Sequence, residues 1–288
     1  MRAIVTGASF GLGEAFAAGL AARGVDLLLV ARTDARLLPM AADLGAAHSI
    51  RAEIVTLDLV DEDAPCQLQA QADRLGFEPD VLVHAAHIDV AGPFAEIPLE
   101  RIADSVRLGV EGLVALTHLY LPRMVARKQG AIVNVASSGA FAPLPGHAVR
   151  AASDAFILSL GAALWAEQRR NGVRVVTVCP GGVEGGARGV DSDEAGGRDR
   201  LRGDVASEHT RRSEGGRARF GSQESREAVV ASTLAAVERG DPVVLPGRGL
   251  GVVSGALGML PPRSRVQTAA WLARRYPNLL RGTRRGER

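Results

Sequence analysis

The chain has 288 residues, with 34 Lys and Arg against 32 Asp and Glu, and a net charge of only +2. This near-neutral balance excludes the broad positive field typical of nucleic-acid-binding proteins, so we expect a small-molecule partner. The length suits one α/β domain over residues 1–288. The two cysteines, Cys66 and Cys179, lie in different expected elements and predict reduced thiols in a cytoplasmic protein. The first strand follows Met1 directly and the longest apolar stretch is residues 250–260, so neither a signal segment nor a transmembrane helix is expected.

Short runs of Val, Ile and Leu alternate with longer segments of helical period, which is the pattern of a parallel sheet covered by helices. The fold class is therefore α/β, a Rossmann-like doubly wound parallel sheet. A helix over residues 226–238 is expected before the last strand. The predicted strands are residues 3–6, 26–31, 54–57, 81–84, 131–136, 173–178 and 242–245.

Two segments interrupt this pattern. Residues 183–223 are rich in Gly, Arg, Asp, Glu and Ser, and they follow the carboxyl end of the sixth strand. We expect a mobile lid there, or else a solvated insertion with no role in binding. Residues 250–288 form a C-terminal extension with an Arg-rich tail that can pack on the pocket mouth, on a second subunit or on an anionic membrane, packing being favoured over the membrane.

A glycine-rich turn joins the first strand to the first helix. It follows Thr6, and the helical pattern begins near Glu14. Glycines allow the sharp turn and let a pyrophosphate approach the main chain at the helix N-terminus. The residues expected to contact a dinucleotide here are Gly7, Ser9, Phe10, Gly11, Leu12 and Gly13.

The spacing TGxxxGxG so close to the N-terminus resembles the short-chain dehydrogenase/reductase family. The resemblance implies further cofactor contacts and a homodimer or homotetramer. Arg32 directly follows the second strand, where family members that hold the 2′-phosphate have a basic residue, which implies NADP(H); alternatively it is a surface arginine that begins a helix. The other implied contacts are Asp58 and Leu59 after the third strand, Ala85 after the fourth, and Pro180 and Gly181 after the sixth.

The resemblance fails at the residues that carry the family's proton transfer. Ser137 stands where the family has its catalytic serine, but Arg150 and Asp154 replace the Tyr and Lys of its Tyr-x-x-x-Lys pair. Gly109 stands at the relay Asn and Gly185 at the Thr that holds the nicotinamide amide. The chain offers no obvious substitute, because its tyrosines are Tyr120 and Tyr276 and its only lysine is Lys128. Efficient alcohol dehydrogenation is therefore not expected.

Arg150 and Asp154 lie four residues apart on an expected helix, so they share one face near Ser137. Either these three residues form a new catalytic site for an anionic substrate, or Arg150 and Asp154 make an ordinary ion pair. His84, His87 and His147 are candidate acids near the cofactor crevice, or plain structural and loop histidines. His84 and His87 lack an identifiable third ligand, so no metal is predicted.

Three functions remain open. The first is an atypical NADP(H)-dependent oxidoreductase that transfers hydride to a substrate needing no tyrosine proton, such as an iminium ion. The second is a non-redox lyase, isomerase or cyclase that uses Ser137, Arg150 and Asp154. The third is a cofactor-binding protein without catalysis.

Overall fold

The structure, a computed structural model, describes residues 1–183 and 224–246 together with the single residues 264, 267, 268 and 271. The expected lid beyond Val183, with Gly185 in it, lies outside the described residues, as does the C-terminal extension apart from those four positions. That residues 1–288 form a single domain stays a prediction. Both Cys66 and Cys179 are free thiols, and the cytoplasmic location stays a prediction too.

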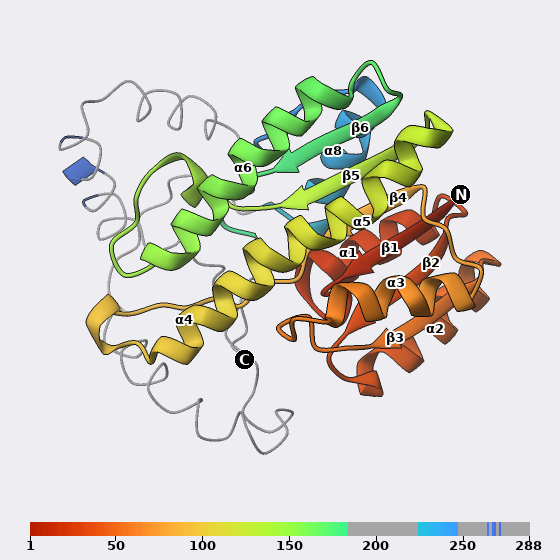
Figure 1. Cartoon of the computed structure of the whole chain (residues 1–288), viewed down its shortest axis with the longest axis horizontal. Helices are drawn as coiled ribbons and strands as arrows, with labels where there is room; N and C mark the ends of the chain where they lie inside the picture. Colours follow the sequence, from red (N-terminus) through yellow and green to blue (C-terminus); the bar gives the residue numbers. More distant parts are fainter. Residues whose placement is uncertain (184–223, 247–263, 265–266, 269–270, 272–288) are drawn as a thin grey trace.

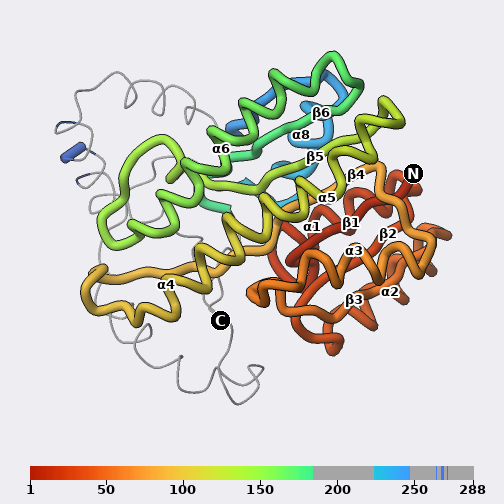
Figure 2. Tube along the Cα trace, in the orientation of Figure 1, coloured from red at the N-terminus to blue at the C-terminus, as the bar shows by residue number. Residues whose placement is uncertain are grey.

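Seven strands form one parallel sheet in the order β3-β2-β1-β4-β5-β6-β7, which confirms the predicted α/β fold. From β1 at the centre, β2 and β3 are added on one side, and β4 to β7 are added in order on the other side. Figure 2 shows the two resulting halves side by side, red to orange and yellow to blue. The strands are β1 (Arg2–Thr6), β2 (Asp26–Ala31), β3 (Ala52–Thr56), β4 (Val81–His84), β5 (Gly130–Val135), β6 (Val173–Val178) and β7 (Val243–Val244).

Helices cover both faces of the sheet, because central strands such as β2 and β4 are apolar and buried on both sides. One core joins residues such as Val5, Leu29 and Val133 to Phe16 and Val230, on the face covered by α1, α2 and α8. The opposite core packs the sheet against α3 and α5, which cross in front of the strands in Figure 1. The helices are α1 (Gly11–Ala21), α2 (Asp34–His48), α3 (Ala64–Arg74), α4 (Leu99–Val106), α5 (Gly112–Arg127), α6 (Ala148–Gln168) and α8 (Arg226–Arg239).

The carboxyl ends of the strands meet at one edge of the sheet. In Figure 1 the strand arrowheads point toward the side on which α4 lies, together with the loop between β5 and α6. That loop contains a short 3-10 helix, η3 (Ser138–Phe141), and α4 runs into a π-helical turn, η2 (Arg107–Glu111), before α5. Ligands of open α/β sheets bind at this edge, near the point where the strand order reverses.

One described helix, α6, has the length and the apolar composition to cross a membrane. Length and composition alone are weak evidence, because helices that pack on a core pass the same test. Here α6 packs against β6 and η3.

Candidate active and cofactor-binding site

The glycine turn is shaped by close approaches that only glycine permits. Gly7 has a φ of +67°, and a Cβ there would lie 2.7 Å from Cα of Ala86. A Cβ on Gly13 would lie 2.1 Å from the carbonyl oxygen of Gly7. Helix α1 begins at Gly11, earlier than the expected start near Glu14, with Phe10 extended before it. The backbone N–H groups of its first turn are available to an anion, as a pyrophosphate requires.

The Thr6 side chain ties this turn to the end of β4. Its Oγ1 donates to the carbonyl of Val83 at 3.2 Å and accepts from the backbone N–H of Ala85 at 3.2 Å. Thr6 is 2% exposed, so these bonds lie in the interior, where they are difficult to replace. The main chain of Ala85 is thus fixed to the end of β1, beside the glycine turn.

The other residues expected at the cofactor lie along the same edge of the sheet. Arg32 is exposed directly after β2, and Leu59 is buried after β3. Asp58 is exposed and accepts a hydrogen bond from the N–H of Val60 at 3.1 Å. The carbonyl of Pro180 accepts from the N–H of Ser138 at 2.8 Å, which joins the turn after β6 to the loop after β5.

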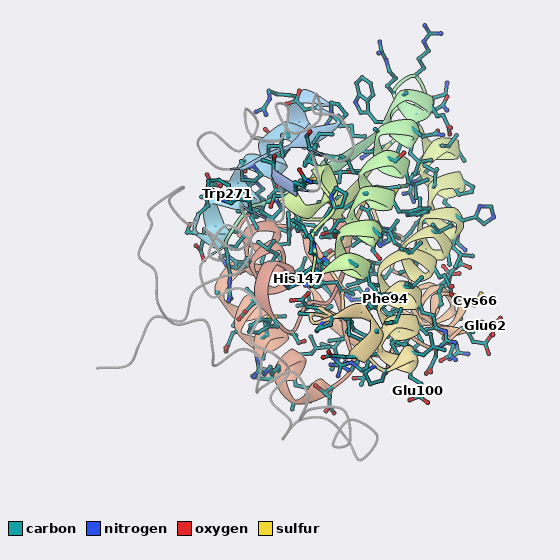
Figure 3. All side chains as sticks on the ribbon, turned by 90° about the vertical axis from the view of Figure 1, so that its left-hand side faces the viewer. Glu62, Cys66, Phe94, Glu100, His147 and Trp271 are labelled. Atoms are coloured by element: carbon teal, nitrogen blue, oxygen red, sulfur yellow. The ribbon has the colours of Figure 1, made fainter. Side chains whose placement is uncertain are left out.

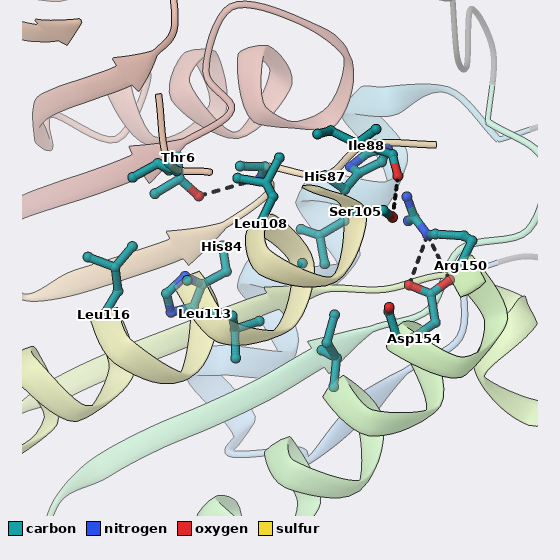
Figure 4. Close-up of a pocket in the computed structure, with 17 residues that line it drawn as sticks. Thr6, His84, His87, Ile88, Ser105, Leu108, Leu113, Leu116, Arg150 and Asp154 are labelled. Carbon is teal, nitrogen blue, oxygen red and sulfur yellow. Dashed lines mark hydrogen bonds and ion pairs between the residues drawn. The ribbon is translucent and has the colours of Figure 1, made fainter. Parts of the chain in front are cut away.

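A narrow pocket with a cavity volume of about 20 Å³ lies beside this crevice. Figure 4 shows its walls, which come from the ends of β1, β4 and β5, from η2 and α5, and from the start of α6. Its polar lining includes Thr6, His84, His87, Arg150 and Asp154. Among the described residues that line it there is neither a tyrosine nor a lysine.

Ser137, Asp154 and Arg150 form one hydrogen-bonded cluster. The Ser137 hydroxyl donates to Oδ2 of Asp154 at 2.5 Å and accepts from the N–H of Gly139 at 3.0 Å. Nε of Arg150 lies 3.0 Å from both carboxylate oxygens of Asp154. The Asp154 side chain is 1% exposed and that of Arg150 16%, so this ion pair is largely buried. The structure thus brings the three expected residues together.

His87 lies at the pocket mouth, where it is exposed. Its Nδ1 donates to the carbonyl of Ala85 at 3.2 Å, which leaves Nε2 of the neutral ring as an acceptor. The Arg150 guanidinium, followed by desolvation, lowers the pKa of His87 to about 4. We regard Arg150 as the main cause, since the ring keeps contact with solvent. Near neutral pH His87 therefore accepts hydrogen bonds and does not serve as an acid.

His147 pairs with Asp89 next to this mouth. The His147 Nδ1 lies 3.8 Å from Oδ1 of Asp89. Burial raises the pKa of Asp89, but the neighbouring His147 and the Arg150 charge outweigh it and bring the value to about 2. Figure 3 looks onto this edge of the sheet, with His147 near its centre. No pattern in the sequence indicates this pair, because Asp89 and His147 lie on separate loops.

His84 belongs to a row of buried polar side chains beneath the pocket. The sheet register aligns Thr6 with His84, His84 with Asn134, and Asn134 with Thr177. The His84 Nε2 lies 3.1 Å from Oγ1 of Thr117 on α5. Burial lowers the pKa of His84 from 6.5 to about 3, so it stays neutral. This row also escaped the sequence analysis, because it depends on the register of four strands.

The structure places the other residues that the sequence analysis considered for proton transfer. Gly109 lies in the η2 turn and lines the pocket, and a Cβ there would meet nothing within 4 Å. Tyr120 is 1% exposed in the core beside α3, where burial raises its pKa above its ordinary value of 10. Lys128 precedes β5, at the opposite edge of the sheet from the pocket. Tyr276 lies outside the described residues. In the described part of the chain no cluster of His, Cys, Asp and Glu can hold a metal ion.

Known proteins resemble the chain in sequence. A sequence model of the short chain dehydrogenase family matches residues 1–195. A very-long-chain 3-oxoacyl-CoA reductase of Phaeosphaeria nodorum is 33% identical over 183 residues, which cover 61% of this chain and 53% of the relative. An oxidoreductase of Myxococcus xanthus is 35% identical over 182 residues, covering 63% of this chain and 72% of the relative. The chain thus spans about half the length of the very-long-chain reductases that it matches.

Solved structures agree with the sequence matches. A short-chain dehydrogenase from Sphingobium yanoikuyae in complex with NADPH has a TM-score of 0.71 and 26% identity, covering 89% of this chain and 91% of that one. A metagenomic short-chain oxidoreductase in complex with NADP has a TM-score of 0.59 and 30% identity, covering 64% and 83%. The glycines of the turn after β1 have no side chains that would keep a pyrophosphate from the main chain. The turn therefore suits the nicotinamide dinucleotides bound in these two neighbours. From the matching family model and these structures, the chain belongs to the short-chain dehydrogenase/reductase family of oxidoreductases.

Proposed function

We propose that the chain is an NADP(H)-dependent oxidoreductase that transfers hydride to a substrate needing no proton from a tyrosine, an iminium ion being the simplest case. The observation that carries this proposal is the Ser137, Asp154 and Arg150 cluster beside the pocket. The cofactor would supply the hydride when bound. Ser137, Arg150 and Asp154 would border the reacting centre, and Arg32 would hold the 2′-phosphate.

The cluster supports this chemistry because its members do not replace the missing acid. Arginine keeps its charge at all ordinary pH values and therefore does not donate a proton. The Ser137 hydroxyl is committed to Asp154. His87, with a pKa of about 4, is neutral near pH 7 and keeps its one ring proton on Nδ1, bonded to the carbonyl of Ala85. A carbonyl oxygen would have to take its proton from water, whereas an iminium nitrogen needs none.

A panel of hydride acceptors tests this proposal. Purified protein is mixed with NADPH and with matched pairs of a ketone and the corresponding imine, plus a 3-oxoacyl thioester of the kind that the named relatives reduce. We expect the imines to be reduced about 10² times faster than the ketones, the low end of what a placed general acid contributes. Equal or faster ketone reduction would contradict the proposal. Conversion of a substrate without NADPH consumption would point to a lyase or isomerase instead.

One observation favours a second candidate, a cofactor-binding protein without catalysis. Ser137, Arg150 and Asp154 bond to one another, as they would in a purely structural ion-pair cluster. In that case NADPH would raise the melting temperature, by an amount that corresponds to about 2.7 kcal/mol at 100 times its dissociation constant. No acceptor in the panel would then be reduced.

A further inference from the structure

The outer end of the Arg150 side chain points into the pocket. Its Nε is used by Asp154, and within the described part of the chain its two terminal amino groups make no hydrogen bond. The side chain is only 16% exposed. In Figure 4 the guanidinium of Arg150 lies above Asp154 and extends toward Ile88 and Ser105. The two terminal nitrogens are not sealed off from solvent, so they face the open part of the pocket and can donate to the oxygens of a ligand.

Three acceptors of the protein lie near this guanidinium, and the first of them, the Asp89 carboxylate, pairs with His147. Ser105 donates to the carbonyl of Ile88 at 2.9 Å, so that carbonyl already has a partner. The Asp154 carboxylate is held by Ser137 and by the Nε of Arg150. The fork of N–H groups on Arg150 matches the two oxygens of a carboxylate.

His87 adds the complementary group. It lines the same pocket, and its Nε2 is an acceptor because Nδ1 donates to Ala85. The pocket therefore presents forked cationic donors and, at its mouth, a neutral acceptor. A ligand that fits both has a carboxylate and an N–H donor, which are the groups of an amino or imino acid.

We propose that the substrate is an iminium carboxylate, whose carboxylate is bound by the terminal N–H groups of Arg150 and whose nitrogen donates its hydrogen to Nε2 of His87. This inference rests on the proposed function and specifies its substrate class. In the reaction the iminium carbon accepts hydride, and the C=N π pair becomes the lone pair of the amine nitrogen. The nicotinamide is oxidised, and no other proton or co-reactant is needed.

Two ring compounds that differ in one group test the role of the carboxylate. NADPH oxidation is measured with 1-pyrroline-2-carboxylate and with 2-methyl-1-pyrroline, in which a methyl group replaces the carboxylate. We expect the wild-type kcat/KM to be about tenfold or more higher for the carboxylate, as a charged hydrogen bond implies. The double variant Arg150→Gln with Asp154→Asn removes both charges together, so that no buried carboxylate is left unpaired, and it should lose the preference.

Arg169→Gln is the matched control. Arg169 lies at the other end of α6 and stacks over Trp165 at 5.5 Å, far from the pocket residues. This variant should keep the wild-type preference for the carboxylate. Equal kcat/KM for the two imines in the wild type would overturn the inference while leaving the proposed function intact.

Calorimetry supplies a readout that does not depend on turnover. Pyrrolidine-2-carboxylate and pyrrolidine-2-carboxamide are titrated into the wild type, the double variant and Arg169→Gln. We expect about tenfold tighter binding of the carboxylate, equal to about 1.4 kcal/mol, in the wild type and in Arg169→Gln only. If neither imine is reduced, the proposed function fails. The carboxylate site is then overturned separately if carboxylate and carboxamide bind alike.

Discussion

The hydroxyl of Ser137 lies 2.5 Å from Oδ2 of Asp154, and the same carboxylate accepts from Nε of Arg150 at 3.0 Å. Ser137, Asp154 and Arg150, which stand at three positions of the family's catalytic site, therefore form one hydrogen-bonded network. The serine hydroxyl is held by the protein, and the charge of the buried aspartate is balanced by the arginine. The consequences for stability, cofactor binding and catalysis can each be measured.

Removing Arg150 alone should destabilise the fold. Arg150→Leu leaves the Asp154 carboxylate, which is 1% exposed, without its cation, at a cost of about 3 kcal/mol in the free energy of unfolding. The double variant Arg150→Leu with Asp154→Leu should recover most of this loss. Urea unfolding measures both. As a control, Arg239→Leu breaks an exposed pair with Asp241 and should cost less than about 1 kcal/mol. Equal losses for the two arginines would show that the Arg150 pair is not a buried one.

Gly7 should be more sensitive to substitution than another glycine with the same backbone conformation. Gly7 and Gly24 have φ values of +67° and +70°, so alanine adds similar strain at both, about 1–2 kcal/mol. At Gly24 a Cβ meets nothing within 4 Å, whereas at Gly7 it meets the backbone of Ala86. Gly7→Ala should therefore abolish the thermal stabilisation by NADPH, and Gly24→Ala should retain it. The idea is wrong if both variants respond to NADPH alike.

Arg32 should set the preference for the phosphorylated cofactor. Arg32→Ala removes a cation at the end of β2, where the adenosine 2′-phosphate is expected. We expect about 10- to 100-fold weaker NADPH binding, the range for a hydrogen bond to a charged group, and little change for NADH. Fluorescence titration with the two cofactors measures the ratio. Parallel losses for NADPH and NADH would assign Arg32 no role in this choice.

Stability should fall in acid partly because of His84. Burial lowers its pKa from 6.5 to about 3, so between these pH values the unfolded chain binds a proton that the folded chain does not. The free energy of unfolding therefore decreases as pH falls from 6.5, by up to about 1.4 kcal/mol per pH unit for one such histidine. His84→Asn should flatten this slope in urea unfolding at pH 7, 6 and 5. An unchanged slope would show that His84 is not buried in its neutral form.

Much of the fold could be predicted because its signals are local. Runs such as Leu27 to Val30 are apolar on both faces, as a central parallel strand must be, and the glycine turn follows β1 directly. Even so, α1 begins at Gly11 and not near Glu14 as predicted. The sequence pattern does not show that the carbonyl of Phe10 already accepts the N–H of Glu14, at 3.5 Å.

The site was only partly predictable, since its contacts join distant segments. Ser137 and Asp154 were expected near each other, but the bond between them depends on how the loop after β5 returns to α6. The fixed tautomer of His87 comes from a backbone carbonyl two residues away. The π-helical turn at Gly109 is likewise not indicated by the residues around it.

The most direct test of the central claim is to restore the family's pair. Arg150→Tyr combined with Asp154→Lys returns a phenol and an ammonium to the pocket beside Ser137. Turnover of NADPH is measured for a ketone and for its matched imine, in the wild type and in this double variant. We expect the ratio of ketone to imine turnover to rise about tenfold or more, because a placed general acid speeds only the reaction that needs a proton. A wild type that already reduces the ketone as fast as the imine, with a double variant that is slower on the ketone, would contradict the account.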